Sequence, residues 1–163
     1  MKFTTFIKAY KLALSNIGSR TASWKGVYLG DVHFPENNNR LVFIFSSGPF
    51  MELGDIGMSA TLNIDSVEKL DGGLNSIAKM TGDALDKDVM SREYLSKNEK
   101  INECGRIMVL LETLLDRFKT VEPDKWESAD IESVFFNFDK DLAEFSVDGV
   151  KIYTNGSLVL FGD

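Results

Sequence analysis

The sequence predicts an α+β fold in a single domain, with antiparallel strands on either side of amphipathic helices. Two hairpin signals near the C-terminus, Asp-Gly at 148–149 and Asn-Gly at 155–156, separate short runs of β-forming residues. Apolar residues recur at helical spacing over 99–119 and over 3–17. No shift in composition divides the chain, so we expect residues 1–163 to form one domain.

Residues 3–17 are expected to form an N-terminal amphipathic helix. Its apolar residues recur at three- and four-residue steps and share one face: Phe3, Phe6, Ile7, Tyr10, Leu14 and Ile17. Gly18 is placed to end this helix. Because Lys2, Lys8 and Lys11 lie off the apolar face, we expect a core-packed helix with a basic side in water.

Several segments in the first half of the chain indicate strands. Residues 22–32 alternate loosely, which favours a strand weakened by its glycines. Residues 41–45 are a continuous apolar run of β-formers, typical of a strand buried on both faces. We expect residues 50–53 to return as its hairpin partner, while the alternation over 60–64 favours a further strand.

The middle of the chain contains the strongest helical pattern. Residues 99–119 have a broad apolar stripe, which favours packing against a sheet or several helices over a two-stranded coiled coil. Residues 67–80 have helical spacing interrupted by two glycines, so we expect a short or broken helix capped by Ser66. The polar residues 82–88 are expected to form a loop.

Residues 133–162 are expected to form a four-stranded antiparallel meander. Turn residues at 139–141, 148–149 and 155–156 separate four runs rich in β-branched and aromatic residues. The Asp-Gly and Asn-Gly pairs favour type I′ turns, which require positive φ at both central positions.

Charge is sorted along the chain, whose net charge is −7. The first thirty residues carry five cations and no acid, whereas residues 121–163 carry ten acids and three lysines. An acidic chain disfavours passive binding to nucleic acid, because phosphate neutralisation by Lys and Arg supplies most non-specific affinity. The acidity favours either plain solubility or a basic partner surface.

Few residues suit catalysis or metal binding by motif. The chain has one cysteine, Cys104, and one histidine, His33, and it lacks the glycine-rich phosphate-binding motifs. A pair of these two as nucleophile and base is disfavoured because Cys104 occupies a core position of a helix. We therefore expect no catalytic residue, no cofactor and no metal, and consider a binding role more favoured than an enzyme.

The cysteine count, the N-terminal pattern and the lengths of the apolar runs indicate a cellular compartment. One cysteine permits no disulfide within the chain, the N-terminus lacks the pattern of a signal peptide, and no run has the roughly 20 apolar residues of a membrane span. We therefore expect a cytoplasmic protein with no membrane span.

These observations favour a non-enzymatic macromolecule-binding protein. The specific hypothesis is an acidic inhibitor or immunity-type protein. Its own C-terminal sheet would block a basic, nucleic-acid-handling protein. Carboxylates spaced over a rigid sheet imitate nucleic-acid phosphates and complement a basic groove. The candidate partner-binding residues are Asp124, Glu127, Asp130, Glu132, Asp139, Asp141, Glu144 and Asp148.

A first alternative follows from two similar strings at 44–54 and 152–162. Both read Ile, an aromatic residue, two polar residues, Gly, a strand and a final Gly. Each string resembles the strand–turn–strand hairpin of the TATA-box-binding-protein saddle. The resemblance implies a nucleic-acid-binding module in which Phe45 and Tyr153 wedge into the DNA minor groove. The chain departs from that family because the basic residues that such a saddle needs are absent.

Two further alternatives remain open. A hydrolase built on carboxylates would use a divalent metal, with Asp139 and Asp141 in one turn as candidate ligands. Alternatively, the basic first helix lies against the acidic sheet of its own chain, so that the charge sorting is structural and indicates no partner.

Overall fold

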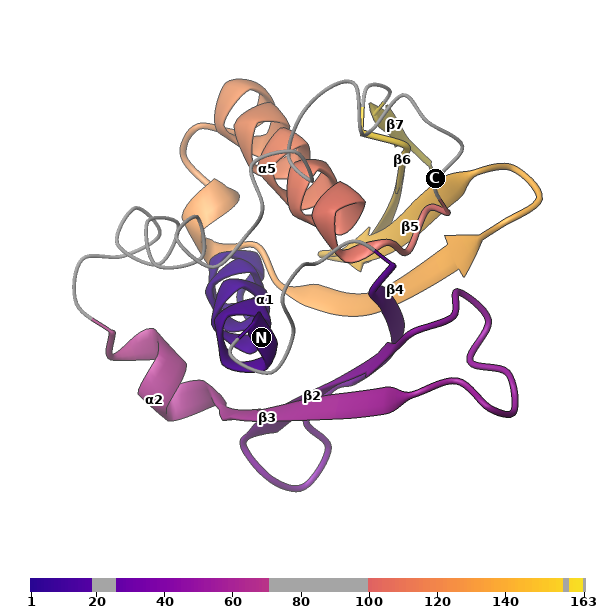
Figure 1. Ribbon diagram of the computed structural model, residues 1–163. Coiled ribbons are helices and arrows are strands. Elements are labelled where there is room, and N and C mark those ends of the chain that lie inside the picture. Colours follow the sequence, from indigo (N-terminus) through magenta and orange to yellow (C-terminus); the bar gives the residue numbers. More distant parts are fainter. Residues whose placement is uncertain (19–25, 71–99, 157–158, 163) are drawn as a thin grey trace.

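The computed structural model describes residues 1–18, 26–70, 100–156 and 159–162 (Figure 1). They form an α+β fold with an N-terminal helix, a three-stranded sheet and a C-terminal four-stranded sheet, which confirms the predicted fold class. The elements in chain order are α1 (Phe3–Gly18), β1 (Tyr28–His33), β2 (Arg40–Ser46), β3 (Gly57–Asn63), α2 (Ile64–Glu68), α5 (Cys104–Val121), η1 (Trp126–Ser128), β4 (Ile131–Asn137), β5 (Leu142–Val147), β6 (Val150–Thr154) and β7 (Val159–Phe161).

Helix α1 is the central element of the core. It lies between the three-stranded sheet and α5 (Figure 1), and it is buried on almost every side. The expectation of a basic side in water is therefore wrong for Lys11, which is 4% exposed and whose Nζ lies 3.5 Å from Oε1 of Glu112 on α5. Lys8 is half-buried, and Lys2, which precedes the helix, is exposed.

The three-stranded sheet has the order β1-β2-β3 and is antiparallel. Phe43 and Phe45 of β2 are fully buried, and Phe43 packs on Phe6 of α1 with ring centroids 5.6 Å apart. Val42 and Ile44 point to the other face and are only half-buried. The prediction of burial on both faces is wrong because α1 covers one face alone.

The hairpin partner of β2 also differs from the prediction. β2 pairs with β3, whereas residues 50–53 belong to a loop over 47–56. Ser47 and Ile56 close this loop: Ser47 N donates to Ile56 O at 2.9 Å, and Ile56 N donates to Ser47 Oγ at 2.8 Å. The strand expected at 60–64 is confirmed as part of β3.

Two helix starts shift relative to the prediction. Asn63, not Ser66, caps α2, since its Oδ1 accepts a hydrogen bond from Ser66 N at 3.1 Å. Helix α5 begins at Cys104 because the preceding backbone pairs with β1: Leu29 N donates to Asn102 O at 2.8 Å, and Cys104 N donates to Val27 O at 3.0 Å. The predicted loop at 82–88 and most of the helix expected over 67–80 lie outside the described residues.

The C-terminal sheet confirms the predicted meander, with the strand order β4-β5-β6-β7 and antiparallel pairing throughout. Asp148 and Gly149 have φ values of 51° and 77°, the positive values that a type I′ turn requires. At the second turn only Gly156 of the Asn-Gly pair has positive φ, so a type I′ turn is not formed there. Helix α5 lies beside this sheet (Figure 1).

No helix within the described part of the chain combines the length and the apolar character that a membrane crossing requires.

Candidate functional site

The eight candidate carboxylates occupy three separate places in the fold. Asp130, Glu132 and Asp148 gather where β4 begins and where β5 turns into β6. Asp148 Oδ1 accepts from Asp130 N at 2.8 Å, and Asp148 N donates to Asp130 O at 2.9 Å. Ser146 Oγ also donates to Glu132 Oε2 at 3.3 Å. These contacts stabilise the chain at this end of the sheet.

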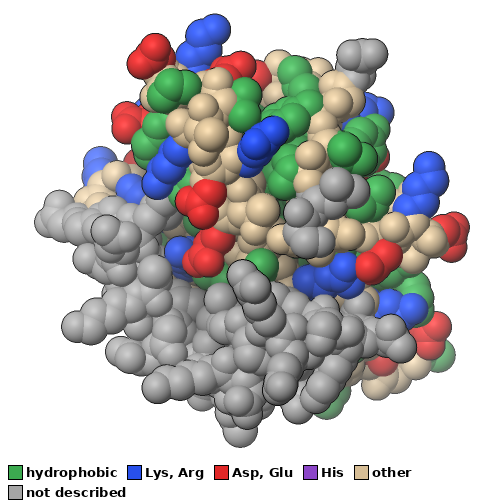
Figure 2. All heavy atoms as spheres, turned by 90° about the horizontal axis from the view of Figure 1, so that it is seen from above, with side chains coloured by type: hydrophobic (Ala, Val, Ile, Leu, Met, Phe, Trp, Pro, Cys, Tyr) green, Lys and Arg blue, Asp and Glu red, His purple; other side chains and the backbone are tan. Residues whose placement is uncertain are grey.

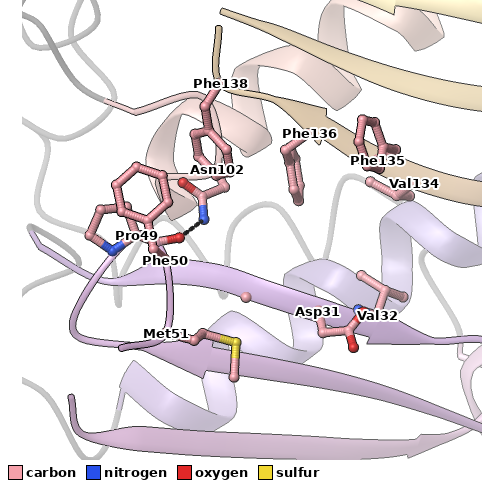
Figure 3. Close-up of a pocket in the computed structure, with 11 residues that line it drawn as sticks. Asp31, Val32, Pro49, Phe50, Met51, Asn102, Val134, Phe135, Phe136 and Phe138 are labelled. Atoms are coloured by element: carbon pink, nitrogen blue, oxygen red, sulfur yellow. Dashed lines mark hydrogen bonds between the residues drawn. The ribbon is translucent and has the colours of Figure 1, made fainter. Parts of the chain in front are cut away.

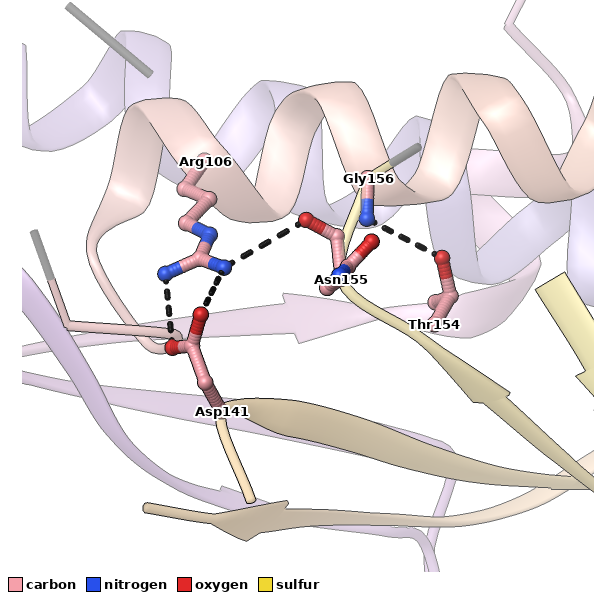
Figure 4. Close-up of polar contacts among 5 residues, drawn as sticks. All are labelled: Arg106, Asp141, Thr154, Asn155 and Gly156. Atoms are coloured by element: carbon pink, nitrogen blue, oxygen red, sulfur yellow. Dashed lines mark hydrogen bonds and ion pairs between the residues drawn. The ribbon is translucent and has the colours of Figure 1, made fainter. Parts of the chain in front are cut away.

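A second set of carboxylates lies toward the other end of β4. Asp139 and Asp141 are in the β4–β5 turn, and both Asp141 oxygens accept from Arg106 (Figure 4), with Nη1–Oδ1 at 2.9 Å and Nη2–Oδ2 at 2.6 Å. Glu144 lies on β5, with its Oε1 3.4 Å from Lys151 Nζ. Asp141 and Glu144 are therefore paired with cations of their own chain.

Asp124 and Glu127 form the third place, after the end of α5: Asp124 precedes η1 and Glu127 lies within it, and both are exposed. The structure thus does not gather the eight carboxylates into one array. In the view from above, acidic, basic and hydrophobic side chains are interspersed (Figure 2). The N-terminal ammonium also lies 3.9 Å from Asp130 Oδ1, so part of the sorted charge is matched within the chain.

A row of side chains crosses the outward face of the four-stranded sheet. The strand register places Phe135 opposite Glu144, Glu144 opposite Tyr153, and Tyr153 opposite Leu160. Phe135 is 59% exposed and Leu160 is 49% exposed. This row is not predictable from the sequence, because the mainly apolar run at 134–138 does not reveal which residues face outward. We call these four residues the outward row.

A hollow of about 330 Å³ lies on the same face. Its walls combine apolar and charged side chains from β4, the following turn, β5, β6 and β7: Asn137, Lys140, Leu142, Glu144, Tyr153 and Leu160. Three members of the outward row, Glu144, Tyr153 and Leu160, therefore line a hollow in this face of the sheet.

A second cavity, of about 290 Å³, lies between β1 and β4 (Figure 3). Phe136 and Phe138 approach it from the β4 side, and Phe50 and Met51 line it from the 47–56 loop. Asn102 lines it just before α5. We call this cavity the inter-sheet pocket. This pocket is not predictable from the sequence, because its walls come from four segments that are distant along the chain.

Cys104 and His33 do not form a reactive pair. Cys104 is buried, and burial raises the pKa of its thiol well above the ordinary value of 9.0, so the thiol stays protonated. The His33 side chain is more than half exposed at the end of β1, with Nε2 3.0 Å from Asp31 Oδ2.

Among the residues that the structure describes, no group of three or more His, Cys, Asp or Glu side chains is placed to hold a metal ion. Asp141, one of the two residues considered as metal ligands, has both carboxylate oxygens hydrogen-bonded to Arg106.

The two strings at 44–54 and 152–162 do not form equivalent hairpins. In the first string a loop follows β2, whereas in the second β6 pairs directly with β7. Phe45 is fully buried, packed beside Phe43 with ring centroids 6.3 Å apart. The two strings therefore do not form the duplicated hairpin that the first alternative requires, and Phe45 is not available to wedge between DNA bases in this fold.

Comparison of the chain with protein-family models, with curated proteins and with solved structures gave no match.

Proposed function

We propose that this protein is a non-enzymatic, macromolecule-binding protein of the inhibitor or immunity type. It blocks a basic, nucleic-acid-handling protein partner by covering that partner's surface with the outward face of its four-stranded sheet. The observation that carries the proposal is the outward row, in which exposed Phe135 and Leu160 flank Glu144 and Tyr153 on one rigid surface.

The composition of this face supports a protein contact. Protein interfaces concentrate aromatic residues at the centre, with a polar and charged rim. Phe135 and Tyr153 supply aromatic area, and exposed Leu160 extends it to the last strand. Aromatic side chains in such positions commonly carry most of the binding energy of an interface.

The charge of the rim supports a basic partner. Glu132 lies on β4 near one end of this surface, and Asp139 lies in the turn after its other end; both are exposed. The chain as a whole has a net charge of −7. Complementary charge accelerates encounter with a basic surface and makes binding dependent on salt. Surfaces that handle nucleic acid are basic, since they neutralise phosphates.

The proposal is tested by capture of partners on the tagged, full-length protein from a nuclease-treated lysate of its source cells. The expected result is a basic protein that is retained at low salt, is lost at high salt and is unaffected by nuclease. The double variant Phe135→Ser/Leu160→Ser should abolish capture. Val121→Ser, which removes an equally exposed apolar side chain from the end of α5, is the matched control.

The inhibitory part of the proposal needs the identified partner in pure form. Added protein should displace a labelled oligonucleotide from that partner, and the double variant should not. A partner that binds equally well at low and high salt, or equally well to the double variant, contradicts the proposed function.

A further inference from the structure

We propose that the inter-sheet pocket binds an arginine side chain of the basic partner. This inference rests on the proposed function and adds the group that anchors the partner. Three features of the pocket support it: aromatic walls, a buried amide oxygen that lacks a donor, and a lining without any cationic side chain among the described residues.

The walls of the pocket provide ring faces for a planar cation. The rings of Phe50 and Phe138 lie with centroids 4.8 Å apart and planes inclined by 60°. Phe136 projects from β4 toward the same space, and the Met51 thioether lies across from it (Figure 3). The guanidinium group of arginine stacks on aromatic faces and is attracted to their negative centre.

Asn102 supplies a hydrogen-bond acceptor with no donor. Its Nδ2 donates to Leu29 O at 3.0 Å and to Pro49 O at 2.9 Å, which fixes the orientation of the amide. Its Oδ1 has no hydrogen-bond partner among the described residues, and Asn102 is only 1% exposed. Buried acceptors of this kind are rare in folded proteins and favour a ligand that brings an N–H group.

Entry to the amide oxygen passes beside Phe50. This residue is 53% exposed on the 47–56 loop, and its ring lies next to Asn102 in Figure 3. Binding at the amide oxygen therefore requires the exposed Phe50 side chain to rotate, and Phe50 lies in a loop outside both sheets.

The charges near the pocket complement a cation. Asp31 lines it, and its carboxylate accepts from Val32 N at 2.8 Å and lies 3.0 Å from His33 Nε2. Among the described residues, Lys100 places its ammonium near these rings, with Nζ 5.5 Å from the Phe50 centroid. Phe50 thus already attracts a cation of its own chain. Lys100 also opposes a second cation, so its removal should strengthen binding.

Arginine fits these features better than lysine or a neutral side chain. It offers several N–H donors in a plane, so one face stacks on a ring while an edge donates to Asn102. A wholly apolar side chain would leave Asn102 Oδ1 without a donor. The pocket volume of about 290 Å³ is at the lower end for ligand sites and suits one long side chain.

The pocket is continuous with the proposed contact surface. Phe135 lines the pocket and is also the first member of the outward row. A partner that covers the outward face can therefore insert one arginine across the β4 edge.

The test titrates the full-length, isotope-labelled protein with N-acetylarginine amide and follows the Met51 methyl and Asn102 side-chain amide signals by NMR. N-acetylcitrulline amide has nearly the same shape without the charge and serves as the neutral probe. We expect saturable shifts at both residues with the arginine probe and binding about tenfold weaker with the citrulline probe.

Variants locate the binding. Asp31→Asn and Phe50→Leu should each weaken the arginine probe severalfold, while Lys100→Ala should strengthen it. Asp116→Asn removes an exposed carboxylate from α5 and should leave binding unchanged. No saturable shift at Met51, or equal binding of the two probes, overturns the proposal.

The outcome for the pocket is separable from the outcome for the proposed function. Partner capture that depends on Phe135 but not on Asp31 or Phe50 supports the proposed function and rules out the arginine anchor. Saturable binding of the arginine probe without a salt-sensitive partner supports the guanidinium site and contradicts the proposed function.

Discussion

Arg106 on α5 and Asp141 in the β4–β5 turn form a two-point ion pair that joins the first turn of the helix to one end of the sheet (Figure 4). The Arg106 side chain is 9% exposed, whereas that of Asp141 is 57% exposed. Asp141 also has a positive φ of 54°, a conformation that non-glycine residues seldom adopt. The ion pair therefore holds the turn in a conformation of modest strain.

The first prediction concerns this pair. Asp141→Asn should lower the free energy of unfolding by about 1 to 3 kcal/mol, because it leaves the guanidinium of Arg106 with a weaker partner at a mostly buried position. Urea unfolding measures the effect. Asp139→Asn removes a charge from the same turn, where no described residue pairs with it, and should leave the midpoint unchanged. Equal effects of the two substitutions would show that the ion pair contributes nothing to stability.

The second prediction concerns alkaline pH. Burial raises the pKa of the Cys104 thiol above 9.0 and the pKa of the Tyr10 hydroxyl above 10.0. In the unfolded chain both groups ionise near their ordinary values, whereas in the folded protein they stay protonated. Their contribution to stability is therefore complete below about pH 8.5 and falls as the pH rises above it.

The measurement is the free energy of unfolding from pH 7 to pH 10, which spans the ordinary thiol value. Cys104→Ala should reduce the alkaline loss of stability, since one of the two ionising groups is gone. An alkaline loss that is the same with and without Cys104 would contradict the predicted role of its burial.

The third prediction concerns the packing of the 47–56 loop on β1. A Cβ atom added at Gly30 would overlap the Met51 side chain, so Gly30→Ala should displace Met51. Because the Met51 side chain is flexible, the expected loss is small, about 1 kcal/mol. The double variant Gly30→Ala/Met51→Ala should lose less stability than the two single variants together. Additive effects in this cycle would show that the two residues do not interact.

The fourth prediction concerns the hydrogen bond between α1 and α5. Tyr10 Oη donates to Cys104 O at 2.9 Å in the buried core. Tyr10→Phe removes the donor with little change of volume and should destabilise the protein by about 1 kcal/mol. Thermal unfolding of the variant measures this loss. An unchanged melting temperature would indicate that the first turn of α5 satisfies this carbonyl by other means.

Local patterns predicted the elements whose stability is encoded locally. The spacing of Phe6, Tyr10 and Leu14 defined α1, and Asp148-Gly149 defined a tight turn between two strands. The strand predicted at 50–53 does not form. These residues lie in a loop that is closed by Ser47 and Ile56, which meet only once the sheet forms. At this segment, tertiary contacts outweigh the local preference for a β-strand.

The candidate site was harder to predict from the sequence than the fold. Which face of β4 carries Phe135 depends on a register shift between Ile131 and Ser133, and an apolar run does not encode that shift. Asn102 became notable only through its contacts with Leu29 and Pro49. The carboxylates were visible in the sequence, but their division among three places followed from the fold.

The proposed function is tested most directly by partner capture with matched surface variants at two salt concentrations. The structure-based expectation is that the native protein retains a basic partner at low salt, that Val121→Ser retains it equally, and that Phe135→Ser/Leu160→Ser loses it. Circular dichroism should show that all three proteins are folded. Retention of the same partner by the folded Phe135→Ser/Leu160→Ser protein would contradict the proposal that the outward face of the four-stranded sheet is the binding surface.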